Sequence, residues 1–94
     1  MVIVSLTYKR PLEDVEKHGA AHVEWLGKGY DAGLLIASGR KVPRTGGVII
    51  ARGTLASVKA LCETDPFFVH QVADYDFTEV EVLYTASGLE ALKC

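Results

Sequence analysis

The sequence has 94 residues, of which 49% are hydrophobic and 23% are charged, and its formal net charge is −2. A chain of this length forms one small domain, here residues 1–94, and its slightly acidic balance offers nucleic acid no general electrostatic attraction. Its apolar runs are shorter than the roughly 18 residues of a membrane span, and its first basic residues follow the apolar N-terminal stretch, unlike a secretory signal, so we expect a cytoplasmic protein without membrane or nucleic-acid partners.

The N-terminal half predicts a strand followed by a long helix. Residues 2–8 are rich in β-branched side chains and alternate in a way that is typical of a strand. Pro11 then starts a helix expected over about 11–32, because proline in the first turn loses no hydrogen bond. Gly33 can supply the left-handed residue at the C-terminal end of this helix.

The second half predicts a hairpin, a helix and a final strand. The stretches LLIASG and GGVIIAR indicate two strands, and the polar segment RKVPRT between them forms the hairpin loop. Thr54 is the expected N-cap of the second helix, which ends before Asp65 because the residue preceding a proline disfavours helical geometry. A last strand is expected over about 74–84.

The last strand has an unusual apolar pattern, with two sets of opposite parity: Tyr75 and Phe77, and then Val80, Val82 and Tyr84. Alternation does not change phase within a regular strand. Either a bulge near Thr78 or Glu79, or burial of both faces of the strand, would account for the pattern.

The predicted order is strand, helix, strand, strand, helix, strand, which indicates an α+β protein with the ferredoxin-like βαββαβ fold. We expect a four-stranded antiparallel sheet with both helices on one face. The segments LLIA and VIIA are apolar at consecutive positions, so both faces of these strands need burial. A second copy of the same sheet is the simplest cover, and we therefore predict a homodimer packed sheet to sheet.

Two histidines of the first helix, His18 and His22, stand four residues apart. At about 100° per residue, His22 falls among the apolar positions and projects toward the sheet. It is either a hydrogen-bonded core histidine or a functional base, and the second role needs a carboxylate to hold one ring tautomer. Asp65 is the best candidate, although a turn aspartate that accepts from nearby backbone N–H groups explains it equally well.

Metal and cofactor sites are not expected. A zinc ion shared by His18 and His22 would lack the glutamate of the H-E-x-x-H motif, because Gly19 stands at that position. The sequence carries no nucleotide fingerprint that would indicate a flavin. Cys62 and Cys94 have no metal-ligand spacing, and Cys62 is expected in the core.

Basic residues gather in the hairpin, where SGRKVPRTGG contains Arg40, Lys41 and Arg44. Such a loop is usually a solvated surface, although its charge could attract an anionic substrate. The hydroxyl of Ser38 has no adjacent base, so we assign it as a possible substrate contact. Trp25 and Tyr30 are expected to serve packing.

Taken together, these segments resemble the YCII-related family of small dimeric α+β barrel proteins. The resemblance covers nearly all of the chain and rests on HVEWL, on GLLIASG with GGVII, on TDPFF, and on ADYDFTEVEV. It implies a ferredoxin-like fold with sheet-to-sheet dimers. It also implies an active site made of a first-helix histidine and the aspartate of the Asp-Pro turn, which in this sequence are His22 and Asp65.

Some members of that family resemble dehydrochlorinases or related lyases, and similar barrels host isomerases. The sequence therefore suggests a cofactor-independent enzyme in which His22 transfers a proton and Asp65 orients it, on a small anionic or phenolic molecule. A non-catalytic module that binds a small molecule in the same cavity is the alternative. The candidate substrate-binding residues are Ser38, Arg40, Tyr75, Phe77, His70 and His18.

Overall fold

One antiparallel sheet forms the centre of the computed structural model, which describes residues 1–93. Its strands are β1 (Val2–Tyr8), β2 (Leu35–Arg40), β3 (Gly46–Ala51) and β4 (Ala73–Glu79), arranged in the order β2-β3-β1-β4. β1 therefore lies between β3, the second strand of the hairpin, and β4. This order, with helices between the strands, is the predicted ferredoxin-like α+β fold.

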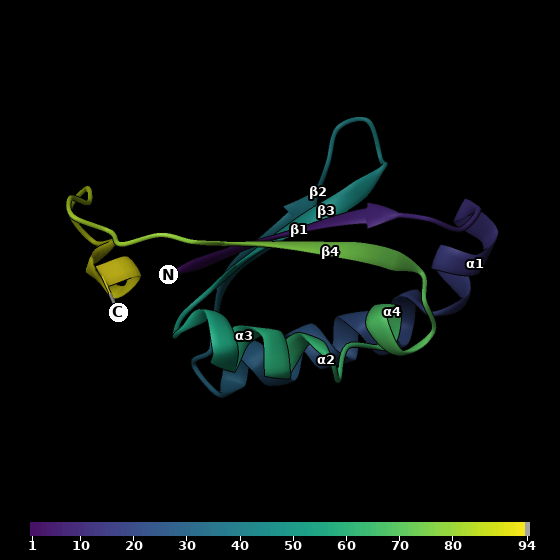
Figure 1. Ribbon diagram of the computed structural model, residues 1–94, viewed down its shortest axis with the longest axis horizontal. Helices are drawn as coiled ribbons and strands as arrows, with labels where there is room; N and C mark the ends of the chain where they lie inside the picture. The colour runs from purple at the N-terminus through teal and green to yellow at the C-terminus, as the bar shows by residue number, and fades with distance from the viewer. Residues whose placement is uncertain (94) are drawn as a thin grey trace.

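The helices lie along one face of the sheet, as Figure 1 shows. They are α1 (Leu12–Lys17), α2 (Gly19–Asp31), α3 (Leu55–Cys62) and α4 (Pro66–Val69), and a 3₁₀ helix, η1, follows at Glu90–Lys93. Within residues 1–93, every helix is too short or too polar to span a lipid bilayer. The opposite face of the sheet carries no helix in this view, which leaves side chains such as Ile3 and Ile50 partly exposed.

The core lies between the sheet and the helices. Alternate residues of β1 point into it, and Val4 sits between Ile49 of β3 and Phe77 of β4 in the strand register. The helices contribute the buried side chains of Val15, Val58, Cys62 and Phe67. The strict alternation of β1 is what the sequence pattern predicted.

The caps predicted from the sequence are present. Gly33 adopts a φ of +73° after α2, as expected for a residue at the C-terminal end of a helix. Thr54 precedes α3, and its hydroxyl oxygen accepts a hydrogen bond from the Ser57 backbone N–H at 3.2 Å. Ser57 returns the contact through its own hydroxyl oxygen, which accepts from the Thr54 backbone N–H at 3.0 Å, so the start of α3 is doubly capped.

The prediction of one continuous helix over 11–32 is wrong, because the chain breaks between α1 and α2 at His18. The backbone of His18 has φ −105° and ψ 3°, outside the α-helical region. The break precedes Gly19, a residue type that supports a helix poorly. His18 and His22 consequently belong to different parts of the first helical segment, since only His22 lies within α2.

The predicted last strand is also too long, since β4 ends at Glu79. The register with β1 is regular throughout, and it places Tyr75 beside Leu6 and Phe77 beside Val4. The change of apolar phase therefore needs neither a bulge nor burial of both faces, because the second set lies after the strand. In Figure 1 this segment extends away from the sheet, and Tyr84 within it is 91% exposed.

Candidate active site

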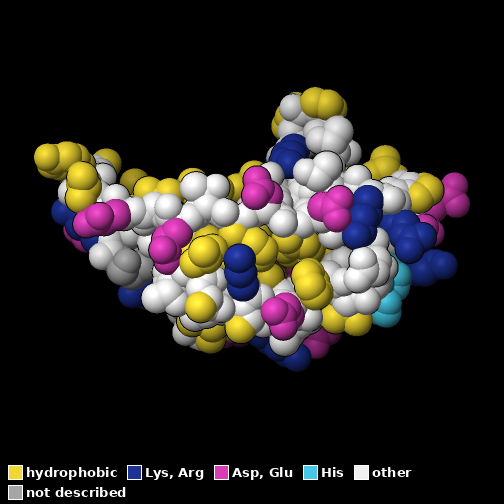
Figure 2. Space-filling model, viewed as in Figure 1, with side chains coloured by type: hydrophobic (Ala, Val, Ile, Leu, Met, Phe, Trp, Pro, Cys, Tyr) yellow, Lys and Arg dark blue, Asp and Glu magenta, His cyan; other side chains and the backbone are white. Residues whose placement is uncertain are grey.

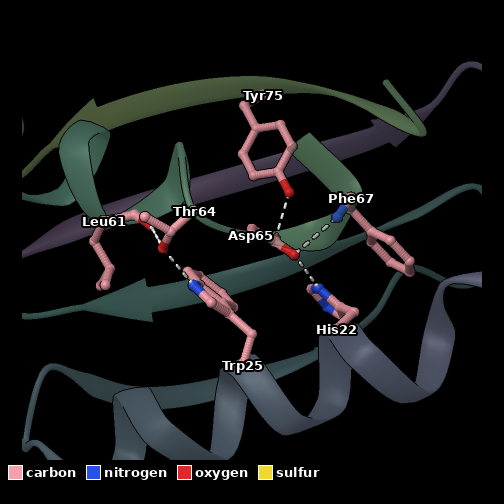
Figure 3. A network of polar contacts seen from close by, with 7 residues as sticks. All are labelled: His22, Trp25, Leu61, Thr64, Asp65, Phe67 and Tyr75. Atoms are coloured by element: carbon pink, nitrogen blue, oxygen red, sulfur yellow. Dashed lines mark hydrogen bonds and ion pairs between the residues drawn. The ribbon is translucent and has the colours of Figure 1, made fainter. Parts of the chain in front are cut away.

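The site begins with a side-chain pair between α2 and the turn that precedes α4. The Nδ1 atom of His22 lies 2.7 Å from Oδ1 of Asp65. The Asp65 side chain is fully buried, whereas His22 remains 14% exposed. Figure 3 shows the two side chains pointing toward each other across the space between α2 and α4. The sequence-based hypothesis that paired these two residues is geometrically satisfied.

Asp65 accepts two further hydrogen bonds. The backbone N–H of Phe67 donates to Oδ1 at 3.0 Å, which makes Asp65 the N-cap of α4. The Tyr75 hydroxyl donates to Oδ2 (Figure 3). Burial of a carboxylate is costly unless donors replace the lost water, and here three donors do so. Both roles considered for Asp65, a backbone cap and a histidine partner, are combined in one carboxylate.

Two neighbouring acids stay protonated at neutral pH. Burial, with a smaller contribution from the negative charge of Asp65, raises the pKa of the Tyr75 phenol far above its usual range. The same two causes raise the pKa of the buried Cys62 thiol to about 12. Tyr75 therefore acts as a hydrogen-bond donor and Cys62 as a core thiol rather than as a nucleophile.

The pair determines which nitrogen of His22 can exchange a proton. An ionised carboxylate only accepts hydrogen bonds, so Nδ1 of His22 carries the proton that points at Asp65. The other ring nitrogen, Nε2, then holds the lone pair. The Phe67 ring stacks on the imidazole at 4.0 Å between centroids with an interplanar angle of 5°, which fixes the plane of the ring.

A cavity of about 160 Å³ adjoins His22 and is bounded by β1, β2, β3 and α2. Part of its wall is apolar and includes Leu6, Leu26, Ile49 and Phe67. The polar side chains on the wall are those of Tyr8, His22, Ser38, Arg40 and Arg44. A compact apolar space with a few polar groups is typical of a small-molecule site.

The predicted contacts Ser38 and Arg40 lie on this wall, as expected. Their register explains the placement, because they pair with Ile49 and Gly47 of β3 and share the helix-covered face of the sheet. The Ser38 hydroxyl also lies 2.6 Å from the Tyr30 hydroxyl, which ties β2 to α2. Tyr30 thus positions a polar group of the cavity, a role beyond the packing expected for it.

Tyr75 and Phe77 do not line the cavity, contrary to the prediction. Both lie on β4, and in the sheet order β4 is separated from β2 and β3 by β1. The Tyr75 hydroxyl donates to Asp65, and Phe77 packs beside Tyr75 at 6.3 Å between ring centroids. Tyr75 therefore supports the aspartate instead of contacting a ligand.

His18 and His70, also expected to contact a ligand, are outside the cavity lining. Their rings stack on each other at 4.0 Å with an interplanar angle of 12°. The histidine side chains visible in Figure 2 gather at the end of the molecule that carries α4. In the part of the chain that the structure describes, no group of three or more His, Cys, Asp or Glu side chains is placed to hold a metal ion.

Phe67 and Arg44 take part in the site although the sequence analysis did not propose them as site residues. Phe67 stacks on His22, and the only signal for it is its position two residues after the capping aspartate. Arg44 lines the cavity although it belongs to a loop whose charges usually face solvent. The sequence indicated that the loop was basic, but it did not indicate which of its charges turns inward.

Comparisons with known proteins agree with this architecture. A family model described as the YCII-related domain matches residues 1–81. The chain is also similar to the solved structure of 5-chloro-2-hydroxyhydroquinone dehydrochlorinase from Burkholderia phenoliruptrix AC1100 in complex with 2,5-dihydroxybenzoquinone. The TM-score is 0.70 at 18% sequence identity, over 85% of this chain and 93% of that one, and this likeness shows a common fold. No curated protein matches the sequence.

Removal of the Tyr75 hydroxyl tests its support of Asp65. We expect Tyr75→Phe to lower the free energy of unfolding by about 1–3 kcal/mol, because a buried carboxylate oxygen loses a donor. Tyr84→Phe is the matched control, since Tyr84 is exposed, and it should change stability by less than about 0.5 kcal/mol. Urea denaturation followed by circular dichroism measures both, and equal stabilities for the two variants would contradict the assignment.

Proposed function

The chain belongs to the YCII-related domain family, and on that premise we propose that it is a cofactor-independent enzyme of the lyase or isomerase type. Its substrate is a small anionic or phenolic molecule, and its reaction is a proton transfer. The observation that supports this proposal is the 2.7 Å contact between His22 and the fully buried Asp65 at the wall of a cavity. A histidine held by a carboxylate is a common general base.

In the proposed reaction, Nε2 of His22 removes a proton from the substrate. Asp65 stabilises the imidazolium that forms and keeps the ring in place. In an elimination, the electron pair of the broken C–H bond forms the new double bond, and the leaving group departs as an anion with the electron pair of its bond to carbon. The imidazolium then releases its proton to solvent. In an isomerisation, the imidazolium returns the same proton to a different substrate atom. Both versions balance without a cofactor.

The opposite wall supplies donors for negative charge that develops on the substrate. The hydroxyl of Ser38 and the guanidinium of Arg40 come from β2, whereas His22 comes from α2. Donors fixed on a strand lose little orientational freedom when they bind an oxyanion. The similar solved structure is that of a dehydrochlorinase, and loss of hydrogen chloride from a hydroxylated ring is therefore the first reaction to test.

We also propose that the functional unit is a homodimer packed sheet to sheet. The support is the face of the sheet opposite the helices, which carries no helix in Figure 1. Ile3 and Ile50 pair in the strand register and are only half-buried. Sedimentation velocity at micromolar concentration should give the mass of a dimer. Ile50→Lys should give a monomer, whereas Val42→Lys, in an exposed loop, should remain dimeric. A monomeric parent chain would contradict the proposal.

Turnover in histidine and aspartate variants tests the enzyme. We expect the parent chain to release chloride from 5-chloro-2-hydroxyhydroquinone or from a small halogenated carboxylate with an acidic C–H bond beside the halide. His22→Gln and Asp65→Asn should lower kcat/KM by about 100-fold or more, because each removes general-base catalysis. His70→Gln is the control, and it should stay within about twofold of the parent since His70 is an exposed histidine outside the cavity lining.

Circular dichroism and thermal melting verify that each variant is folded. Unchanged turnover in His22→Gln would contradict the proposed role of the pair. A ligand that binds stoichiometrically to the parent chain but is never converted would support the non-catalytic binding module instead.

A further inference from the structure

The charged residues that line the cavity are basic. Its lining includes the basic residues Arg40 and Arg44, and no Asp or Glu among the described residues contributes to it. Both arginines come from the β2–β3 hairpin, whereas His22 faces them from α2. Like charges on the wall of a partly enclosed space raise the local concentration of an anion.

Arg44 has a polar atom without an acceptor. Its Nε atom is buried, and no polar atom of residues 1–93 accepts a hydrogen bond from it. One terminal nitrogen of the same guanidinium lies 3.5 Å from Oε1 of Glu16, and the side chain is 32% exposed. Buried donors in proteins are nearly always paired, and an arginine side chain has donors only. The Arg44 guanidinium therefore has more donors than the described part of the chain satisfies, and its side chain is exposed enough to meet an acceptor at the cavity wall.

The loop that carries Arg44 is held in place by its neighbours. The backbone N–H of Tyr8, a residue of the cavity wall, donates to the Thr45 carbonyl oxygen at 2.9 Å. The backbone N–H of Lys41 donates to the Gly46 carbonyl oxygen at 3.0 Å, which closes the loop on itself. The contact with Glu16 at 3.5 Å adds a further restraint on the guanidinium before a ligand arrives, and preorganisation lowers the entropy cost of binding.

The rest of the cavity wall determines the size and polarity of the uncharged part of the ligand. Leu26 and Val23 of α2, Ile49 of β3 and the Phe67 ring make it apolar. The cavity measures about 160 Å³, and an apolar protein cavity of about 150 Å³ accommodates benzene. A fitting ligand is thus a single ring or an aliphatic group of similar size.

We propose that Arg44 binds a carboxylate of the substrate, so that the substrate class is a small carboxylate on a compact apolar or aromatic body. The inference rests on the proposed function and chooses the anionic substrate over the phenolic one. A guanidinium matches the planar geometry of a carboxylate and can bind both of its oxygens. A carboxylate is also ionised throughout the neutral range, whereas a simple phenol is mostly protonated there.

Binding of benzoate and benzamide tests the inference without any turnover. The two molecules have the same ring and nearly the same size, and only benzoate carries the charge. Isothermal titration calorimetry should give a dissociation constant for sodium benzoate at least about tenfold lower than for benzamide. Equal affinities, or no binding of benzoate at millimolar concentration, would overturn the proposal.

Variants of the hairpin then test which basic side chain binds the carboxylate. Arg44→Gln should weaken benzoate binding by at least about tenfold and leave benzamide binding unchanged. Lys41→Gln is the control, because it removes the same charge from the same loop while the Lys41 ammonium contacts Thr7 instead of the cavity. It should keep benzoate affinity within about twofold. Benzoate binding by Arg44→Gln as tight as that of the parent chain would overturn the proposal. If the variant does not fold, the affinities of the parent chain for benzoate and for benzamide test the proposal instead.

The same assay separates this inference from the proposed function. His22→Gln should keep the preference for benzoate over benzamide, because Arg44 is intact, although we expect it to lose turnover. If the parent chain prefers benzoate but His22→Gln has unchanged turnover, the carboxylate site is supported and the proposed general base is rejected. If His22→Gln loses turnover but the parent chain shows no preference for benzoate, the general base is supported and the carboxylate site is rejected.

Discussion

The buried carboxylate of Asp65 is the constraint on which this end of the protein depends. A charge with no exposed surface is stable only if donors surround it, and here they come from α2, α4 and β4. The helix that carries His22, the turn at Pro66 and the strand that carries Tyr75 must therefore meet at one point. This requirement links the packing of α2 and α4 to β4, the edge strand of the sheet.

The orientation of His22 follows from that carboxylate. Nδ1 is engaged by Asp65, the Phe67 ring stacks on the imidazole, and Nε2 is left with the lone pair on a residue that borders the cavity. Burial and the charge of Asp65 raise the pKa of Tyr75 and of Cys62, so neither side chain supplies a base in this cluster. We propose that the hairpin, with Arg40 and Arg44, supplies the charge that binds the substrate.

The sequence predicted the fold well because its signals are local. Alternation in β1, the Thr54 cap and Gly33 each depend on a few neighbouring residues, and all three are confirmed. The pairing of His22 with Asp65 could be proposed from the sequence, because helix periodicity directs His22 toward the sheet and Pro66 places Asp65 in a turn after the second helix. Signals that depend on tertiary packing failed: the break at His18, and the placement of Tyr75 against Asp65 instead of on the cavity wall. No sequence period shows which strand edge borders a cavity.

The most direct test of the central claim is the tautomer of His22, measured by ¹⁵N NMR of the imidazole at about pH 8.5, above the ordinary histidine pKa of about 6.5. We predict that Nδ1 is protonated and Nε2 is not, in the parent chain and in the His18→Gln and His70→Gln variants that assign the signals. The Asp65→Asn variant should lose this preference, since its amide no longer imposes a donor on Nδ1. A parent chain with the proton on Nε2 would contradict the account, because no lone pair would then be left to act as a base at the cavity.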